Sequence, residues 1–293
     1  MKIINTVAEL QAALATPRQN GKSIALVPTM GALHEGHLSL IHRARTENDI
    51  VVVSVFVNPI QFNNPEDLAK YPRTVDADCQ KLASAQADIA FVPSVEEMYP
   101  QPVNDVYHFG PIEEVMEGPR RPGHFSGVAV VLRRLFDLVQ PVRAYFGEKD
   151  FQQIAVVRNL IEQIHYPIEI VACPIVRADD GLALSSRNMR LSPAARAIAP
   201  RIYATLQSAV ERSKTASVAE VKEWVLDTLR NINSDDATLI NPDTHTVFDP
   251  EYFEIVNDTT LQPVNEWSDA DGIVGCITVW LTGVRLIDMI RFR

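Results

Sequence analysis

The sequence lacks the features that mark secreted and membrane-spanning proteins. Its only cysteines, Cys79, Cys173 and Cys276, are widely spaced in apolar surroundings and form no C-x-x-C pair, so we expect buried thiols in a reducing compartment. The N-terminus has no apolar core of a signal peptide. The longest apolar runs, 50–57 and 273–281, are too short to span a bilayer. These absences predict a cytoplasmic protein with no membrane partner.

Positive charge is also scarce. The chain carries 27 Lys and Arg against 37 Asp and Glu, a formal net charge of −10. Proteins that hold nucleic acid by its phosphates usually have a basic balance or patch, so this charge favours a small-molecule substrate and argues against nucleic acid. With 293 residues, 46% of them hydrophobic, the chain is long enough for a sizeable core and two domains.

The most informative segment contains two histidines at a predicted strand-to-helix junction. Residues 24–27 predict a short buried strand, and a Pro/Gly turn follows before the apolar positions of a helix begin. His34 and His37 are three residues apart, which places both imidazoles on one helical face. Gly31 and Gly36 allow the backbone to approach a bulky ligand, and a helix N-terminus favours phosphate. The segment therefore predicts a cradle for a triphosphate.

Two other interpretations of this histidine pair remain open at this point. A His-x-x-His pair is often incidental, and two histidines at this spacing also occur in metal sites. The strand, turn and helix around the pair favour nucleotide binding.

A second candidate contact follows the next predicted strand. Residues 50–57 form a continuous apolar, largely β-branched run, typical of a strand buried on both faces of a parallel sheet. The turn 58–62 then lies at the carboxyl edge of the sheet, where ligands of open α/β folds gather. This position makes Gln61 a candidate substrate contact, although a loop amide facing water is the alternative.

A third candidate lies where another predicted strand ends at Gly147. Lys149 and Asp150 follow it, and a Lys and an Asp at such an edge suit a phosphate and its Mg²⁺. An ordinary helix start with an acidic capping residue is the alternative. The charged segment 120–127 is expected to be a loop that either covers a site or is simply solvated, and the sequence does not define the roles of Arg121 and His124.

The pattern of predicted elements changes near residue 176. Strands and helices alternate before it, which predicts an α/β, Rossmann-like domain with a parallel sheet over residues 1–176. A polar hinge over residues 177–188 follows, and residues 177–293 predict a smaller α+β domain. Its expected helices cover 193–213 and 218–231, and its expected strands cover 252–256, 273–280 and 284–287.

Six segments, in this order and spacing, resemble the pantoate–β-alanine ligase family, nucleotidyltransferases with a His-x-Gly-His signature on a Rossmann-like fold. The resemblance covers nearly the whole chain and departs from the family pattern at 241–258 and 289–293. The segments are Pro28–His37, Phe56–Phe62, Tyr71–Thr74, Arg121–Phe125, Phe146–Gln153 and Asp180–Asn188.

The resemblance implies an ATP-dependent ligase that condenses pantoate with β-alanine through a pantoyl-adenylate and releases pyrophosphate and AMP. It implies Mg²⁺, a homodimer, and a C-terminal domain that acts as a lid. The catalytic residues would be His34, His37, Lys149 and Arg187, with Gln61 and Gln153 on the substrates and Asp150 on the metal. The expected ATP contacts are Met30, Gly31, His34, Gly36, His37, Gly147, Lys149, Asp150, Val176, Leu184, Ser185, Ser186 and Arg187.

Three rival functions are weighed against this one. Another His-x-Gly-His adenylyltransferase with a phosphorylated acceptor would release pyrophosphate but no AMP. An aminoacyl-tRNA synthetase is disfavoured by the short acidic chain and the absence of a Lys-Met-Ser-Lys-Ser motif. A silent nucleotide-binding protein should have lost one of His34, His37, Lys149 or Arg187, and the chain has kept all four.

Overall fold

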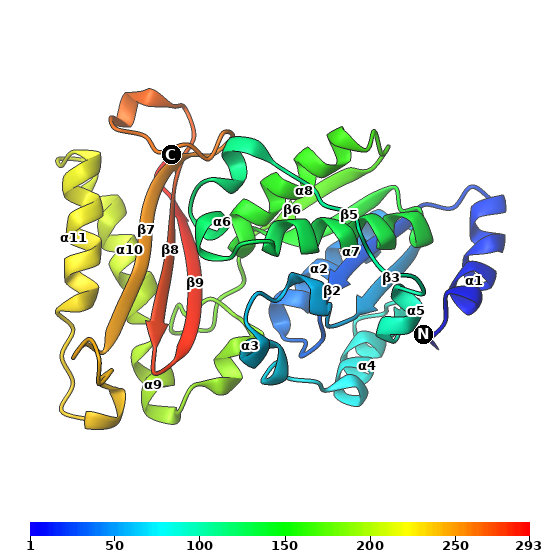
Figure 1. Cartoon of the computed structure of the whole chain (residues 1–293), viewed down its shortest axis with the longest axis horizontal. Coiled ribbons are helices and arrows are strands. Elements are labelled where there is room, and N and C mark those ends of the chain that lie inside the picture. The colour runs from blue at the N-terminus through cyan, green and yellow to red at the C-terminus, as the bar shows by residue number, and fades with distance from the viewer. The chain divides into compact units, whose positions relative to one another are not determined.

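The computed structural model describes all residues 1–293, which divide into two compact units (Figure 1). The N-terminal unit consists of Met1–Glu113, Gly118–Glu148 and Gln153–Pro174. The C-terminal unit consists of Glu114–Glu117, Lys149–Gln152 and Ile175–Arg293. Two short segments that precede residue 175 therefore belong to the C-terminal unit.

The N-terminal unit contains a six-stranded sheet, and every strand pair in it is parallel. The strand order is β1-β4-β3-β2-β5-β6, which confirms the predicted α/β class with a Rossmann-like parallel sheet. The strands are β1 (Lys2–Ile4), β2 (Ile24–Thr29), β3 (Ile50–Val55), β4 (Ile89–Phe91), β5 (Arg143–Gly147) and β6 (Glu169–Cys173).

Helices cover both faces of this sheet, which explains its nearly continuous apolar strands. Alternate strand residues point to opposite faces, so Leu26 packs in one core cluster and Val27 in the other. The Leu26 cluster includes residues of α1 (Val7–Gln19), α7 (His124–Val139) and α8 (Phe151–Gln163). The Val27 cluster includes residues of α2 (Glu35–Glu47) and α4 (Val75–Ser84).

Several expected boundaries were wrong. The predicted loop 120–127 is partly helical, because Phe125 and Gly127 are buried in the first turn of α7 and Gly123, with φ of +78°, reverses the chain just before it. The strand predicted over 50–57 ends at Val55. The sequence analysis did not predict the short helices α3 (Pro65–Ala69), α5 (Val95–Met98) and α6 (Glu117–Arg120), nor the 3₁₀ turns η1 (Pro59–Gln61), η2 (Gly110–Glu113) and η3 (Glu148–Asp150).

The C-terminal unit is an antiparallel sheet packed against helices, as an α+β pattern predicts. Figure 1 shows β7 (Phe248–Asn257), β8 (Ile273–Leu281) and β9 (Val284–Arg291) side by side. The helices are α9 (Pro193–Ile198), α10 (Arg201–Arg212) and α11 (Val218–Arg230), and the remaining 3₁₀ turns are η4 (Ser186–Arg190), η5 (Ala237–Leu239) and η6 (Trp267–Asp269).

One helix expected over 193–213 is two helices. Pro200 lies between α9 and α10, and a proline has no N–H to continue the helical hydrogen bonds. The stretch 241–258, which departs from the family pattern, contains β7, and the tail 289–293 contains the end of β9.

The three cysteines are free and buried, as predicted. Burial raises the pKa of the Cys276 thiol to about 12. None of the helices combines the length and the apolar composition needed to cross a membrane.

Candidate active site

The carboxyl edge of the parallel sheet has a point where the strand order reverses. Strand β2 lies between β3 and β5, and the chain passes from β2 to β3 on one side and later returns through β5 on the other. Open α/β sheets bind ligands at such a point, in the crevice outside the strand ends. Met30 directly follows β2, and Gly147 is the last residue of β5, so both predicted contacts lie at this edge.

The two histidines cap helix α2 reciprocally. The N–H of Gly36 donates to His34 Nδ1 over 3.2 Å, and the N–H of His34 donates to His37 Nδ1 over 3.3 Å. His34 is the N-cap with extended backbone, not a helical residue as expected, yet the ring centroids are 4.0 Å apart. Because both Nδ1 atoms accept, each neutral ring carries its proton on Nε2. The pair therefore presents two Nε2–H donors beside a helix N-terminus, which suits an anion.

A buried carboxylate holds the loop that leads to these histidines. Asp78 of α4 is fully buried, and it accepts the N–H groups of Ala32 at 2.9 Å and Leu33 at 2.7 Å. The Thr74 hydroxyl donates to the same carboxylate at 3.1 Å. A Cβ on Gly31, whose φ is +80°, would meet Asp78 Oδ2 at 3.0 Å, so the loop needs glycine there. Asp78 was not among the predicted site residues, because nothing near it in the sequence points to the loop.

Gln61 lies in η1 after β3, with its side chain almost fully buried. Its Oε1 accepts from Asn58 Nδ2 at 3.2 Å, and its Nε2 donates to the Met30 sulfur at 3.1 Å. Asn58 is itself held by further hydrogen bonds. Its Nδ2 donates to the Gly127 carbonyl oxygen at 3.0 Å, and its Oδ1 accepts from the Tyr99 hydroxyl at 3.0 Å. The protein therefore orients the Gln61 amide through these hydrogen bonds. This differs from the alternative interpretation, in which a loop amide faces water.

The structure also explains His124, whose role the sequence left open. Its Nδ1 lies 2.8 Å from the carbonyl oxygen of Gln61, which can only accept, so Nδ1 carries the proton. Gly127, one turn along α7, packs directly against the backbone of Gln61. A Cβ at this position would be 2.6 Å from the Gln61 Cα. The first turn of α7 thus fixes the backbone position of Gln61.

In the C-terminal unit, a hairpin brings two predicted ATP contacts together. The N–H of Leu184 donates to the Val176 carbonyl at 3.0 Å, and Arg177 pairs with Ala183 in a β-bridge. Arg177 makes two hydrogen bonds to Asp288 of β9, at 2.6 and 2.9 Å. Burial raises the pKa of the Asp288 carboxyl, and the bonds from Arg177 oppose that rise. The ion pair ties the hairpin to the antiparallel sheet.

Next in the chain, Ser185, Ser186 and Arg187 form the start of η4. The Ser185 hydroxyl accepts the N–H of Arg187 at 3.3 Å, and Ser186 is buried. Asn188 anchors the turn by donating to the Ala183 carbonyl at 3.0 Å. Hydroxyl and guanidinium groups on a tight turn of this kind are suited to phosphate oxygens.

Lys149 and Asp150 cluster with the C-terminal unit, although they follow β5 directly. Lys149 Nζ lies 3.2 Å from Asp150 Oδ2. The neighbouring Gln152 is buried, accepts the N–H of Glu117 at 3.0 Å and donates to the Val115 carbonyl at 2.8 Å. The segment that contains Lys149 is therefore held by segment 114–117.

Segment 114–117 is held in turn by a partly buried ionic network. Arg285 of β9 makes two hydrogen bonds to Glu117, at 2.6 and 2.8 Å, and two to Glu251, at 2.8 and 3.1 Å. Burial opposes the charged form of Arg285, but the bonds to the two carboxylates outweigh it and raise the pKa of the guanidinium. Tyr252 donates to Glu117 at 2.7 Å, and burial raises the pKa of this phenol.

The predicted site residues thus divide between the two units. The N-terminal unit contains Met30, Gly31, His34, Gly36, His37, Gln61, Gly147 and Gln153. The C-terminal unit contains Lys149, Asp150, Val176, Leu184, Ser185, Ser186 and Arg187. Gln153 is half-buried, and no hydrogen bond from its amide to the protein is present.

The donor set fits Mg²⁺ better than a structural transition metal. No group of three or more His, Cys, Asp or Glu side chains is placed to hold a metal ion, so the histidine pair lacks the further ligands of a zinc site. Asp150 supplies one carboxylate, with nearly half of its side chain exposed. Mg²⁺ is commonly held by one or two carboxylates together with substrate phosphates, and this arrangement fits that pattern.

The chain is similar to known proteins over nearly its whole length. The family model of the pantoate-beta-alanine ligases matches residues 2–291. The match includes all of segment 241–258 and residues 289–291 of the tail, the two places that depart from the expected pattern. Pantothenate synthetases of Bacteroides thetaiotaomicron and Porphyromonas gingivalis are each 52% identical to the chain. Both alignments cover the whole of this chain, together with 99% of the first relative and 100% of the second.

Two solved structures have the same fold over the whole chain. Pantothenate synthetase of Thermus thermophilus has a TM-score of 0.89 and 45% identity, and 99% of that chain is covered. The pantoate-beta-alanine ligase of Francisella tularensis, complexed with beta-gamma ATP and beta-alanine, has a TM-score of 0.80 and 32% identity, and 98% of that chain is covered. The chain belongs to the pantoate–β-alanine ligase family.

Proposed function

We propose that this ligase activates pantoate with ATP and then joins it to β-alanine. A pantoate carboxylate oxygen attacks the α-phosphorus, a P–O bond breaks, and pyrophosphate leaves with the bonding electrons. The resulting pantoyl-adenylate then reacts with β-alanine to form pantothenate and AMP. The observation that carries this proposal is the reciprocal His34–His37 cap at the start of α2, directly outside the sheet's topological switch point.

The first step needs positioning and charge neutralisation more than proton transfer. A carboxylic acid with a pKa of about 4 is already ionised at neutral pH, so pantoate needs no general base. Two anions must instead be brought together, and charge must be stabilised as pyrophosphate departs. The Nε2–H groups of His34 and His37 would donate to the phosphates, with His37 stabilising the departing pyrophosphate.

The other residues take roles that match their side chains. Lys149 and Arg187 would neutralise phosphate charge, and Gln61 and Gln153 would hydrogen-bond pantoate. Bound Mg²⁺, held by Asp150 and the phosphates, would neutralise further charge on the triphosphate. The remaining ATP contacts would be Met30, Gly31, Gly36, Gly147, Val176, Leu184, Ser185 and Ser186.

The second step requires a neutral amine and the exclusion of water. The β-alanine nitrogen attacks the acyl carbon, and AMP leaves. Because an acyl-adenylate hydrolyses easily, residues 177–293 would serve as a lid over a nucleotide- and pantoate-binding domain formed by 1–176. We further propose a cytoplasmic homodimer, and light scattering of the purified protein would test the dimer.

The decisive experiment is pyrophosphate–ATP exchange with Mg²⁺ and pantoate but without β-alanine. Exchange that depends on pantoate supports the adenylate, and added β-alanine should then produce AMP. His37→Ala should slow the exchange by roughly 100-fold, a typical effect of losing one transition-state donor. His42→Ala is the matched control, because His42 is exposed on the same helix. Wild-type protein that binds ATP but shows no exchange would contradict the proposal.

A further inference from the structure

A chain of side-chain hydrogen bonds in the N-terminal unit runs from Tyr99 to Met30. The Tyr99 hydroxyl donates to Asn58 Oδ1 at 3.0 Å. Asn58 Nδ2 donates to Gln61 Oε1 at 3.2 Å, and Gln61 Nε2 donates to the Met30 sulfur at 3.1 Å. Asn58 is 1% exposed and Gln61 is 9% exposed, so both amides are shielded from water. Polar groups in a buried chain of this kind depend on one another for their orientation.

Backbone groups fix the direction in which this chain donates. The Gly127 carbonyl, which can only accept, lies 3.0 Å from one end of the Asn58 amide, so that end is Nδ2. The Ile60 N–H, which can only donate, lies 3.3 Å from the other end, which is therefore Oδ1. With Asn58 fixed, Gln61 must turn Oε1 toward Asn58 Nδ2. Gln61 Nε2 consequently faces the opposite way, toward Met30.

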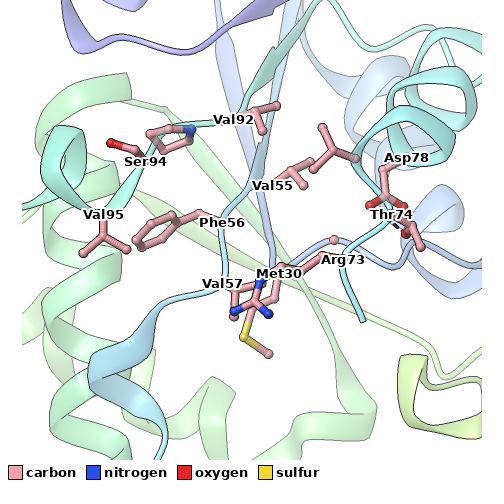
Figure 2. A pocket seen from close by; sticks show the side chains of 13 residues that line it. Met30, Val55, Phe56, Val57, Arg73, Thr74, Asp78, Val92, Ser94 and Val95 are labelled. Carbon is pink, nitrogen blue, oxygen red and sulfur yellow. Dashed lines mark hydrogen bonds between the residues drawn. The ribbon is translucent and has the colours of Figure 1, made fainter. Parts of the chain in front are cut away.

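The donating end of the chain lies beside open space. Met30 directly follows β2 and lines a cavity of about 230 Å³, and Figure 2 shows its side chain, with the sulfur in yellow, among the lining residues. A thioether sulfur is a weak acceptor, so a substrate oxygen that approaches Gln61 would replace it at Nε2. The direction of the chain therefore favours an acceptor atom of the substrate, such as a carboxylate or hydroxyl oxygen, over a donor.

Tyr99, at the other end of the chain, is held by backbone and ring contacts. It ends helix α5, where its N–H donates to the Val95 carbonyl at 2.8 Å. Arg134 Nε of α7 donates to the carbonyl of the preceding residue, Met98, at 3.0 Å. The Tyr99 ring packs edge-on against Phe56, with the ring centroids 6.0 Å apart. Burial raises the pKa of the Tyr99 phenol, so the hydroxyl keeps the proton that it donates.

We propose that Tyr99 is a positioning residue for pantoate binding, whose hydroxyl holds Asn58 and thereby turns Gln61 Nε2 toward a pantoate oxygen. This inference rests on the proposed function. Tyr99 acts through the two amides and does not itself contact the substrate. Without the hydroxyl, Asn58 Oδ1 keeps only the longer bond from the Ile60 N–H, and its amide is free to rotate. Gln61 Oε1 then lacks a fixed partner, and it faces the pantoate carboxylate in part of the molecules and repels it.

The test uses the full-length protein and Tyr99→Phe, which keeps the ring against Phe56 and removes only the hydroxyl. The KM for pantoate in pyrophosphate–ATP exchange should rise roughly 3- to 10-fold, the factor that corresponds to losing one neutral hydrogen bond. The KM for ATP should stay within about twofold of the wild-type value, because the chain ends at Gln61 and not at the phosphate contacts.

Tyr166→Phe is the matched control for a loss that is only structural. The Tyr166 hydroxyl also donates a single hydrogen bond, to the Phe136 carbonyl at 2.6 Å near the end of α7. Its removal should lower the urea midpoint about as much as Tyr99→Phe does and should leave the KM for pantoate unchanged.

A double-mutant cycle tests whether Tyr99 acts through Gln61. In the Gln61→Ala background no amide remains to be oriented, so adding Tyr99→Phe should change the KM for pantoate by less than about twofold. A full 3- to 10-fold rise in that background would overturn the proposal, because Tyr99 would then act by another route.

Two other results would also overturn it. One is an unchanged KM for pantoate in Tyr99→Phe, and the other is an equal rise in Tyr166→Phe, which would show a general loss of rigidity. If the wild type shows no exchange, the proposed function fails. The side-chain amide NMR resonances of Asn58 and Gln61, compared between the wild type and Tyr99→Phe, would then still decide whether Tyr99 holds these amides.

Discussion

The two units bury their carboxylates in different ways. In the N-terminal unit, the fully buried Asp78 is held by the backbone N–H groups of Ala32 and Leu33 and by one hydroxyl. In the C-terminal unit, Asp288 of β9, only 5% exposed, is held by two bonds from Arg177 and one from the Met289 N–H. One carboxylate shapes a loop through amides, and the other binds a cation.

The difference shows how each unit positions its share of the site. Backbone amides are close together along a loop, so Asp78 can define the conformation of consecutive residues before His34. Arginine side chains are long, and in the C-terminal unit they join segments far apart in sequence: Arg177 and Asp288 are 111 residues apart, and Arg285 and Glu117 are 168. The predicted ATP contacts Lys149 and Leu184 depend on these long-range pairs.

Breaking the arginine network should have the largest effect. Arg285→Met removes the guanidinium from Glu117 and Glu251, whose side chains are 12% and 22% exposed, and breaking a largely buried pair of this kind costs up to about 3–5 kcal/mol. We expect a lower urea midpoint and slower pyrophosphate–ATP exchange, because segment 114–117 would no longer hold Gln152. Arg291→Met is the control on the same strand, since its pair with Asp258 is more exposed than the Arg285 network, at 46% and 27% of the two side chains. Equal stability losses in the two variants would contradict the comparison.

Asp78→Asn tests the amide-held carboxylate. The asparagine NH₂ would face a backbone N–H, so at least one buried group loses its partner at a cost of about 1–3 kcal/mol. The loop before His34 should then become less rigid. Pyrophosphate–ATP exchange should slow by more than the fall in the melting temperature accounts for. Asp76→Asn, at an exposed position in the first turn of the same helix, is the control and should change neither measurement.

Gly127→Ala tests how closely α7 must approach Gln61. The added Cβ would overlap the Gln61 backbone, and overpacking of this kind costs about 1–3 kcal/mol. Displacement of Gln61 should raise the KM for pantoate while the KM for ATP stays close to the wild-type value. Unchanged kinetics would mean that the first turn of α7 does not position this amide.

An exposed pair should have the smallest effect. Arg196 and Asp180 interact at 2.6 Å with roughly two fifths of each side chain exposed, so Arg196→Gln should cost below about 1 kcal/mol at pH 7. The hydrogen bond from Arg196 lowers the pKa of Asp180, so the folded state gains stability above the ordinary carboxyl pKa and loses it as pH falls. The difference in the free energy of unfolding between Arg196→Gln and the wild type should therefore vanish in acid. Urea titrations at neutral and at acidic pH would measure this difference.

Much of the N-terminal unit could be predicted because its signals are local. Apolar β-branched runs indicated the buried strands, and the turn after β2 indicated the strand-to-helix junction at which the histidine pair lies. One error has a tertiary cause and another a local one: packing made the segment at His124 helical, and Pro200 divided a helix whose apolar periodicity looked continuous.

The sequence by itself determined the alternation of buried strands and helices, the place of His34 and His37 at the carboxyl edge of the sheet, and the family. Only the tertiary structure identified Asp78, Asn58 and His124 as the groups that hold the site's loops, and Glu117 with Arg285 as the support of the Lys149 segment. The physical reason is that strand and capping signals act over a few residues, whereas a buried polar group takes its partner from whichever segment the fold brings within hydrogen-bonding distance.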